Sequence, residues 1–200
     1  MSFGRHFGLC GCLAVLALTS CADLPPAAAP PNQVHIASHL SMDLPRPADL
    51  GHDLRLDQLV TARYGEKTFT FEGYVLLTDN RLLLTCVDPL GRVAMTVTWT
   101  ADRIVAKKEP WLPPELPPEN MLADLVLLYW PERAVRQALM ESGAQLVATP
   151  RSRSVTIGGR EIVHTAYQSP DVAKPWSGHV ELRNFDFGYT LDIESRELPP

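Results

Sequence analysis

The chain has little cysteine, no concentration of positive charge and no apolar segment of membrane-spanning length at its N-terminus. Its formal net charge is −5, and the absence of a basic tract argues against nucleic acid as a partner. The N-terminal apolar segment, residues 7–18, is shorter than the roughly 20 residues that a membrane-spanning helix needs. The sequence contains four cysteines, and two of them, Cys10 and Cys12, lie inside this segment.

Motifs for catalysis and for cofactor binding are also missing from the sequence. His35 and His39 are spaced like zinc ligands on a helix, but no glutamate follows His35 as in the zinc-protease pattern. Gly158-Gly159 is typical of a hairpin turn, and no G-x-S-x-G nucleophile elbow is present. We therefore expect no enzymatic activity, no metal and no cofactor.

The N-terminus itself has the order of parts of a secretory signal. Arg5 precedes the uncharged segment 7–18, and small residues follow in Leu18-Thr19-Ser20-Cys21. This end resembles the bacterial lipobox. The resemblance implies that residues 1–20 are a lipoprotein signal peptide and that Cys21 receives a diacylglycerol thioether and then an N-acyl chain such as palmitate. An ordinary signal peptide that happens to contain cysteine is the alternative.

Residues 21–33 are rich in proline and alanine, and we expect them to form an extended tether between Cys21 and the folded part. Residues 34–200 are then a single domain. Cys86 is the one cysteine left for it, so no internal disulfide can form and stability must come from an apolar core. Within a strand-like run, Cys86 is best interpreted as a small buried hydrophobe.

The domain pattern favours a mainly β fold with inserted helices. Alternation and turn residues predict about ten strands, and two helices are expected in the middle of the chain, over residues 119–129 and 132–141. The expected strands cover residues 56–64, 67–78, 81–87, 92–100, 103–107, 145–149, 152–157, 161–167, 179–185 and 187–194. We expect a curved antiparallel sheet or a half-open β-barrel with a helical lid.

Several strands and the first helix carry apolar side chains at positions that share one face, and these side chains could line a ligand cavity. Any one of them could instead simply fill a closed core, and the pattern leaves both interpretations open. Trp111 and Trp130 flank the first helix, where either gating or packing fits. The candidate cavity residues are Phe69, Phe71, Val75, Leu77, Met95, Val97, Trp99, Met121, Leu125, Leu128, Tyr189, Leu191 and Ile193.

Two short motifs and the order of parts point to a family. Leu83-Leu84-Thr85 leads to Pro89-Leu90-Gly91, and Leu116-Pro117-Pro118 leads to Leu128-Tyr129-Trp130-Pro131. Over roughly residues 50–195 the chain resembles the LolB and LolA superfamily of lipoprotein receptors and carriers. Within it, the chain is most similar to LolB-like lipoproteins encoded with aryl-polyene gene clusters.

The resemblance implies a LolA/LolB-like half-open barrel whose helices cover an apolar cavity for acyl chains. It also implies that the leucine of the Pro-Leu-Gly turn, Leu90, is exposed and contacts a membrane or a partner when cargo is delivered. A periplasmic LolA-like carrier would be a partner, and the membrane would be contacted through acylated Cys21.

These expectations combine into an outer-membrane lipoprotein that faces the periplasm and binds or transfers an apolar or lipid-linked cargo. Lipoprotein export and aryl-polyene lipid export are both candidate roles. Ala22 after the lipidated cysteine, in place of aspartate, favours the outer membrane. A non-catalytic scaffold or assembly factor for an envelope exporter is the alternative, and a periplasmic hydrolase of an unrecognised type is a third.

Replacement of the lipidated residue tests the lipobox. We expect Cys21→Ala to accumulate as an uncleaved precursor without acyl chains, because the thioether must form before the signal peptide is removed. Metabolic labelling with radioactive palmitate, followed by electrophoresis of membrane fractions, measures both effects. Cys86→Ala is the matched control and should mature normally. Normal maturation of Cys21→Ala would contradict the assignment.

Overall fold

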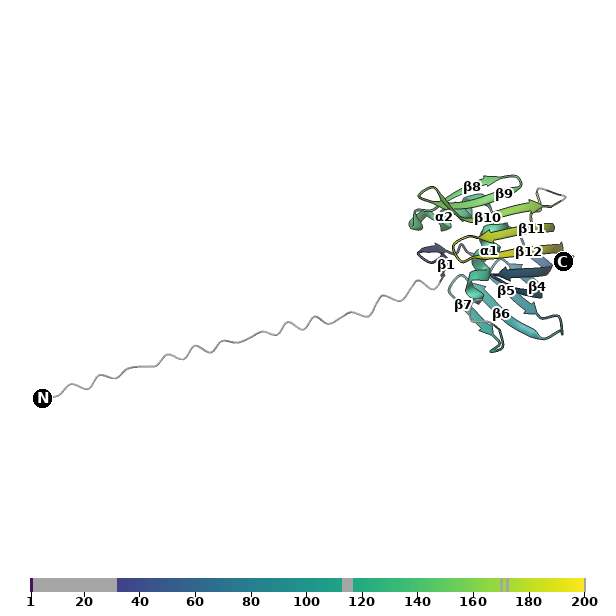
Figure 1. Cartoon of the computed structure of the whole chain (residues 1–200), viewed down its shortest axis with the longest axis horizontal. Coiled ribbons are helices and arrows are strands. Elements are labelled where there is room, and N and C mark those ends of the chain that lie inside the picture. The colour runs from purple at the N-terminus through teal and green to yellow at the C-terminus, as the bar shows by residue number, and fades with distance from the viewer. Residues whose placement is uncertain (2–31, 113–116, 170, 172, 200) are drawn as a thin grey trace.

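The computed structural model describes residue 1 and residues 32–112, 117–169, 171 and 173–199 (Figure 1). The expected signal peptide, Cys21 and nearly all of the tether lie outside these residues. Among the described residues, no helix has the length and apolar character needed to cross a membrane.

Ten strands form one antiparallel sheet, in the order β7-β6-β5-β4-β3-β12-β11-β10-β9-β8. An N-terminal meander contains β3 to β7, and a C-terminal meander contains β8 to β12. They join where β3 pairs with β12, in a register that sets Val60 opposite Ile193. The strands are β3 Leu54–Tyr64, β4 Lys67–Thr78, β5 Arg81–Val87, β6 Val93–Thr100, β7 Ile104–Lys108, β8 Gln145–Thr149, β9 Ser152–Ile157, β10 Arg160–Gln168, β11 Gly178–Asn184 and β12 Tyr189–Glu197.

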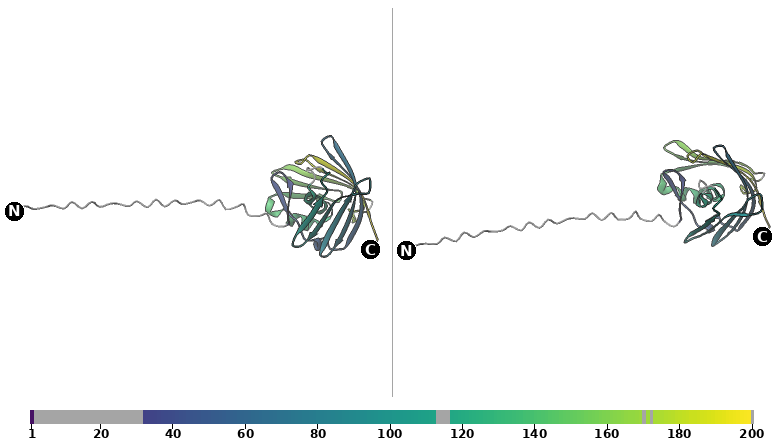
Figure 2. Two further views of the ribbon diagram at one scale, coloured as in Figure 1. Left: turned by 90° about the horizontal axis from the view of Figure 1, so that it is seen from below. Right: turned by 60° about the horizontal axis from the view of Figure 1, so that its bottom comes forward.

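The sheet is strongly curved but is not a closed barrel. A sheet of this many strands curls because each strand is rotated relative to its neighbour by about 20–25°. In the views of Figure 2 the sheet bends around the helices, which occupy its concave side. The edge strands β7 and β8 are not paired with each other in the strand order, so the wall stays open between them.

Alternation along the strands decides which side chains face the helices. In β3, Leu54, Leu56, Gln58, Val60 and Ala62 are buried, while the residues between them are more exposed. Successive side chains of a strand point to opposite faces, so these five share the concave face. The hydrophobic core therefore lies inside the curve of the sheet.

Helix α1, Pro118–Tyr129, is the main element inside the curve. It is apolar nearly all round, and most of its residues are buried, which is typical of a helix surrounded by protein. Pro118 is at its first position, where proline lacks only an N–H that would have no partner. Trp130 and Pro131 end it, and a short second helix, α2 Glu132–Ala138, follows.

A two-stranded hairpin and two short 3-10 turns complete the described domain. The hairpin, β1 Gln33–Ala37 and β2 Leu40–Asp43, lies outside the main sheet and contacts α1. The turn η1, Pro47–Leu50, contacts β4 and β5, and η2, Met140–Ser142, follows α2. Residues 34–54, in which the sequence predicts no definite element, thus contain a hairpin and a turn.

The predicted fold class is confirmed: the chain is mainly β, with two α-helices inserted between β7 and β8 and one large curved antiparallel sheet. Of the two predicted forms, the curved open sheet is the observed one.

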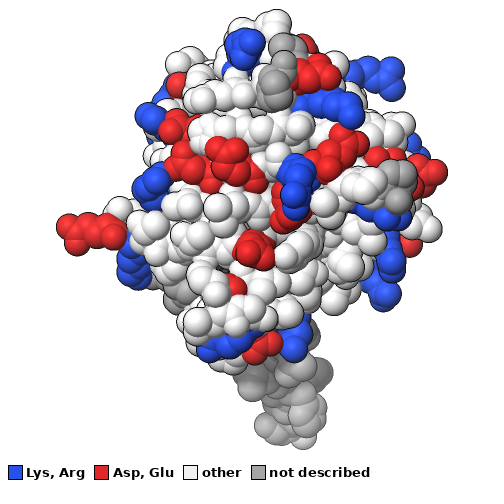
Figure 3. All heavy atoms as spheres, turned by 90° about the vertical axis from the view of Figure 1, so that its right-hand side faces the viewer, with Lys and Arg blue, Asp and Glu red and all other residues white. Residues whose placement is uncertain are grey.

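Cys86 is fully buried, and burial raises the pKa of its thiol to about 12. Acidic and basic side chains are interspersed on the face that Figure 3 shows.

Candidate functional site

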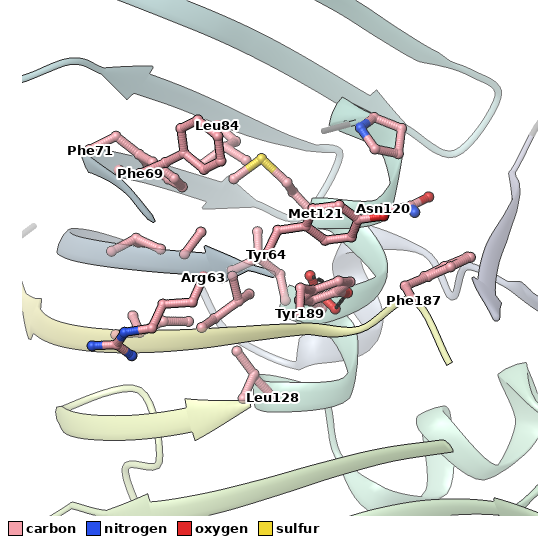
Figure 4. Close-up of a pocket in the computed structure, with 18 of the residues that line it drawn as sticks. Arg63, Tyr64, Phe69, Phe71, Leu84, Asn120, Met121, Leu128, Phe187 and Tyr189 are labelled. Carbon is pink, nitrogen blue, oxygen red and sulfur yellow. Dashed lines mark hydrogen bonds between the residues drawn. The ribbon is translucent and has the colours of Figure 1, made fainter. Parts of the chain in front are cut away.

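A cavity of about 540 Å³ lies between α1 and the concave face of the sheet. Its size falls within the roughly 300–1,000 Å³ of ligand pockets in proteins. Figure 4 shows its side chains converging from β3, β4, β12 and α1.

One face of α1 forms the helical wall of the cavity. The side chains recur at intervals of three or four residues, which places them in a row along the helix. They are Pro117, just before the helix, and Asn120, Met121, Asp124, Leu125 and Leu128.

The sheet forms the opposite wall, through inward-facing residues of five strands. The contributing strands are β3 to β6 and β12, and most of their side chains here are aromatic or aliphatic. The inward residues are Gln58, Val60, Ala62, Tyr64, Phe69, Phe71, Gly73, Leu84, Met95, Tyr189, Leu191 and Ile193. Arg63 and Phe187 lie at its margin, and His35, Ala37 and Ser38 of the β1–β2 hairpin complete the lining.

Most of the residues expected from the sequence to line a cavity do so. They are Phe69, Phe71, Met95, Met121, Leu125, Leu128, Tyr189, Leu191 and Ile193.

Val75, Leu77, Val97 and Trp99 do not line the cavity, so the prediction was wrong for these residues. They are buried on the same concave face but farther along β4 and β6. There the space is filled, because η1 contacts β4 and β5, and the ring of Trp130 lies 5.5 Å from that of Trp99. One end of the trough is therefore solid core, and the other is hollow.

Gly73 helps to keep the hollow end open. It is the inward residue of β4 between Phe71 and Val75, and it has no side chain to fill the space. A Cβ placed on Gly73 would lie 3.7 Å from the Cβ of Gln58, which is ordinary van der Waals contact. A larger side chain would extend beyond that contact into the cavity.

A buried polar group, Gln58, lies in the inner part of the cavity wall. The Gln58 amide donates hydrogen bonds to Tyr129 Oη at 2.9 Å and to Ser195 Oγ at 2.8 Å. Burial raises the pKa of Tyr129 to about 12, so this phenol stays neutral. Gln58, Tyr129 and Ser195 therefore form a hydrogen-bonded cluster that joins β3, α1 and β12 beneath the apolar lining.

Asp124 is the second buried polar group, and it is an acid. The Tyr189 hydroxyl donates to it, with Oη 2.8 Å from Oδ1 and 3.0 Å from Oδ2. Asn184 Nδ2 lies 3.4 Å from the same hydroxyl and also donates to the Ile36 carbonyl at 2.9 Å. Burial raises the pKa of Asp124 to about 7, because removal from water disfavours the charged carboxylate. The carboxyl is therefore easily protonated inside the cavity.

Leu90 occupies the tip of the β5–β6 turn and is 78% exposed. The Asp88 carboxylate fixes this turn by accepting from the backbone N–H groups of Leu90 at 3.0 Å and Arg92 at 2.9 Å. Val87, the last residue of β5, pairs with Glu72, so the turn leaves the sheet level with Phe71. Leu90 thus projects into solvent at the hollow end of the trough.

The two tryptophans beside α1 have different environments. Trp130 is buried against Trp99 and donates through Nε1 to the Arg46 carbonyl, as expected of a packing residue. Trp111 is 47% exposed, and the Arg92 guanidinium lies 4.6 Å from the centre of its ring. Trp111 therefore belongs to the exposed surface around the Leu90 turn.

The histidines are dispersed in the structure. His35 borders the cavity, and its Nδ1 lies 3.0 Å from Ser41 Oγ. His164 lies in β10 of the main sheet, and its Nδ1 lies 2.9 Å from a carboxylate oxygen of Glu161. Within the part of the chain that the structure describes, no three His, Cys, Asp or Glu residues gather in a possible metal site.

Sequence reasoning missed Gln58, Gly73 and Asp124. Each had a signal, because each interrupts an otherwise apolar set: Gln58 and Gly73 on inward strand faces, and Asp124 within the apolar helix. Glycine inside a strand often marks a place where a ligand approaches closely. A lone carboxylate on a buried helical face is rare without a partner.

A family model described as "Protein of unknown function (DUF3261)" matches residues 55–197. No curated protein matches the chain significantly. Among solved structures, the fold is similar to that of a LolA superfamily protein from Nitrosomonas europaea, at 7% identity and a TM-score of 0.39, covering 74% of this chain and 88% of that one. The association with aryl-polyene gene clusters stays a prediction.

The buried carboxyl should make stability depend on pH. An unfolded aspartate has a pKa of about 3.9, so between about pH 4 and 7 the folded state binds more protons than the unfolded state. The contribution of Asp124 to the free energy of unfolding should thus fall as pH rises through this window, by roughly 4 kcal/mol at most. Urea unfolding of the wild type and of Asp124→Asn at pH 4 to 8 measures the difference. A pH-independent difference would contradict the assignment.

Proposed function

The chain belongs to the DUF3261 family, and from its cavity we propose that it binds the hydrocarbon part of an apolar or lipid-linked molecule and carries it. The supporting observation is the hollow of about 540 Å³ with largely apolar walls, next to a core in which Trp99 packs against Trp130. Moving a hydrocarbon chain from water into such walls is favourable by about 0.8 kcal/mol per methylene group. A cavity of this kind needs no catalytic group to be useful.

The rest of the proposed mechanism concerns where the domain is anchored and how it receives its cargo. Acylated Cys21 would anchor the domain to the outer membrane on its periplasmic side, and residues 22–33 would set its reach. Two or more acyl chains anchor a protein stably, whereas one binds reversibly. The cargo could then be received from a periplasmic carrier, in lipoprotein export or in export of an aryl-polyene lipid.

Leu90 is the proposed point of contact with the membrane or a partner. Three exposed groups support this role: Leu90, Val93, which is 49% exposed, and Trp111. The Asp88 hydrogen bonds hold the turn in one conformation, so the leucine is presented without an ordering cost. Apolar side chains gathered on a surface are typical of sites that bind proteins or membranes.

Filling the cavity tests the carrier proposal directly. We expect Gly73→Leu to weaken binding of the neutral dye Nile red at least about tenfold, because the new side chain occupies the ligand space. Fluorescence titration of the purified chain measures the dissociation constant. Thr70→Leu, on the exposed face of the same strand, is the matched control and should bind like the wild type.

The outcome also separates the carrier from the scaffold. If wild-type protein does not bind the dye, or if Gly73→Leu binds it equally well while folded by circular dichroism, the cavity has no carrier role. The non-catalytic scaffold, with its exposed surface as the working part, would then be preferred.

A second variant tests delivery. We expect Leu90→Glu to fold and to bind Nile red normally, yet to release the dye to phosphatidylglycerol-containing vesicles several-fold more slowly. A charged group at the turn should oppose contact with the bilayer interior. Stopped-flow fluorescence measures the transfer rate. Val147→Glu is the matched control, since Val147 is 56% exposed on the distant edge strand β8. Equal transfer rates for wild type and Leu90→Glu would remove the proposed role.

A further inference from the structure

Asp124 is the one carboxylate among the described residues that line the cavity. Its side chain comes from the middle of α1 and accepts a hydrogen bond from the Tyr189 hydroxyl, in a wall that is otherwise mainly apolar. Burial of a charged or polar group without enough hydrogen bonds is unfavourable, so such a group is usually fully paired. Asp124 meets this rule through one donor alone, because both of its oxygens accept from the Tyr189 hydroxyl.

The hydrogen-bonding capacity of Asp124 is only partly used. A carboxylate has about four acceptor positions, whereas Tyr189 supplies a single proton shared between the two oxygens. Asn184 contacts the tyrosine rather than the acid, so it orients the donor and adds no second one. Acceptor capacity therefore remains on a carboxyl that borders an apolar hollow.

Asn120 lies one helical turn before Asp124 and borders the same space. Its amide has two donors and one acceptor. Together, Asp124 and Asn120 form a short polar strip on α1 that faces the aliphatic and aromatic side chains of the sheet. A ligand that matched both walls would have a hydrocarbon part and a compact polar part.

We infer that the cavity selects an amphiphile whose polar group donates hydrogen bonds, such as a hydroxyl or a protonated amine, and that Asp124 accepts from this group while the hydrocarbon part lies along Phe69, Phe71 and Met95. This inference rests on the proposed carrier function and specifies its ligand. A fatty-acid carboxylate would be disfavoured, because two like charges would meet at low dielectric.

The other titratable or charged side chains around the cavity come from three elements. They are His35 of β1, Arg63 and Tyr64 of β3, and Tyr189 of β12. Arg63 is ion-paired with Asp192 and half-exposed, and in Figure 4 its guanidinium points away from the other labelled side chains. His35 is exposed at the margin. Arg63 is thus engaged outside, and His35 must be controlled in any pH experiment.

Competition among amphiphiles with the same dodecyl chain tests the inference. In this experiment Nile red is first bound to the purified chain at pH 8. Dodecylamine, monolauroylglycerol or laurate is then added, each below its micelle concentration, and displacement of the dye is measured. We expect both donors to displace the dye at concentrations about tenfold lower than laurate, as for a hydrogen bond to a charged group. Asp124→Asn, which turns a donor toward the cavity, should reduce this preference to about threefold or less. Glu119→Gln removes a carboxylate of the same helix that does not line the cavity, and it should keep the preference.

A measurement without a variant of Asp124 covers the case in which Asp124→Asn does not fold. Because the carboxyl ionises as pH rises, the concentration of dodecylamine needed for half-displacement should fall several-fold from pH 6 to pH 8. The concentration of monolauroylglycerol should fall less, because its hydroxyl gains a hydrogen bond to a charged acceptor but no ion pair. His35 also borders the cavity, so His35→Gln is the control and must show the same fall. A flat dodecylamine profile would overturn the inference.

The outcomes distinguish this inference from the carrier function. Suppose that the dye binds the wild type but not Gly73→Leu, and that laurate displaces it as well as the two donors do. This result would overturn the role of Asp124 alone. Retention of a tenfold preference in folded Asp124→Asn overturns it as well. Failure of the wild type to bind the dye overturns both.

Discussion

The structure depends on the need to cover the concave face of a single, strongly curved sheet. Ten twisted strands cannot lie flat, and their inward side chains must be shielded from water by something within the curve. Helix α1 is apolar on nearly all sides and is inserted between the two meanders, so it can serve this purpose. One helix of this length fills only part of the trough, and the filled and hollow ends follow from where the neighbouring elements pack.

The division between solid core and cavity is determined by a few bulky and a few small residues. At one end the rings of Trp99 and Trp130 pack against each other in a tilted arrangement, and η1 packs on β4 and β5. At the other end Gly73 and Ala62 replace large side chains on the inward faces of β4 and β3. Protein interiors are normally close-packed, so a hollow of this size in an otherwise dense core is a property that the residues themselves maintain.

The sequence predicted the architecture well and the cavity less well. Alternation identified β3 to β7 and β8 to β12, and the apolar pattern of residues 119–129 placed α1 to within one residue, because these signals are local. The second helix was predicted over residues 132–141 and ends earlier, at Ala138. Alternation also identified the concave face, but it could not separate Trp99, which is in the solid end, from Met95, which lines the hollow. That difference arises from contacts with residues 47–50 and with Trp130, which are distant in sequence. Local periodicity contains no information on which distant element fills a given space.

Asp124 shows how polar groups within the cavity bear on stability and function together. A leucine at this position would continue the apolar face of α1 and would avoid the unfavourable burial of a carboxyl. The acid is held by Tyr189, which in turn is held by Asn184, so residues of two strands are committed to orienting it. Such a chain is hard to explain by packing alone, because an all-apolar wall would be simpler and more stable. The stability lost through Asp124 is understandable if the polar group of a bound ligand completes the hydrogen bonds of the Asp124 carboxyl. The unfavourable burial of the carboxyl would then be offset only in the ligand-bound protein. Occupancy and stability would be linked through a single carboxyl.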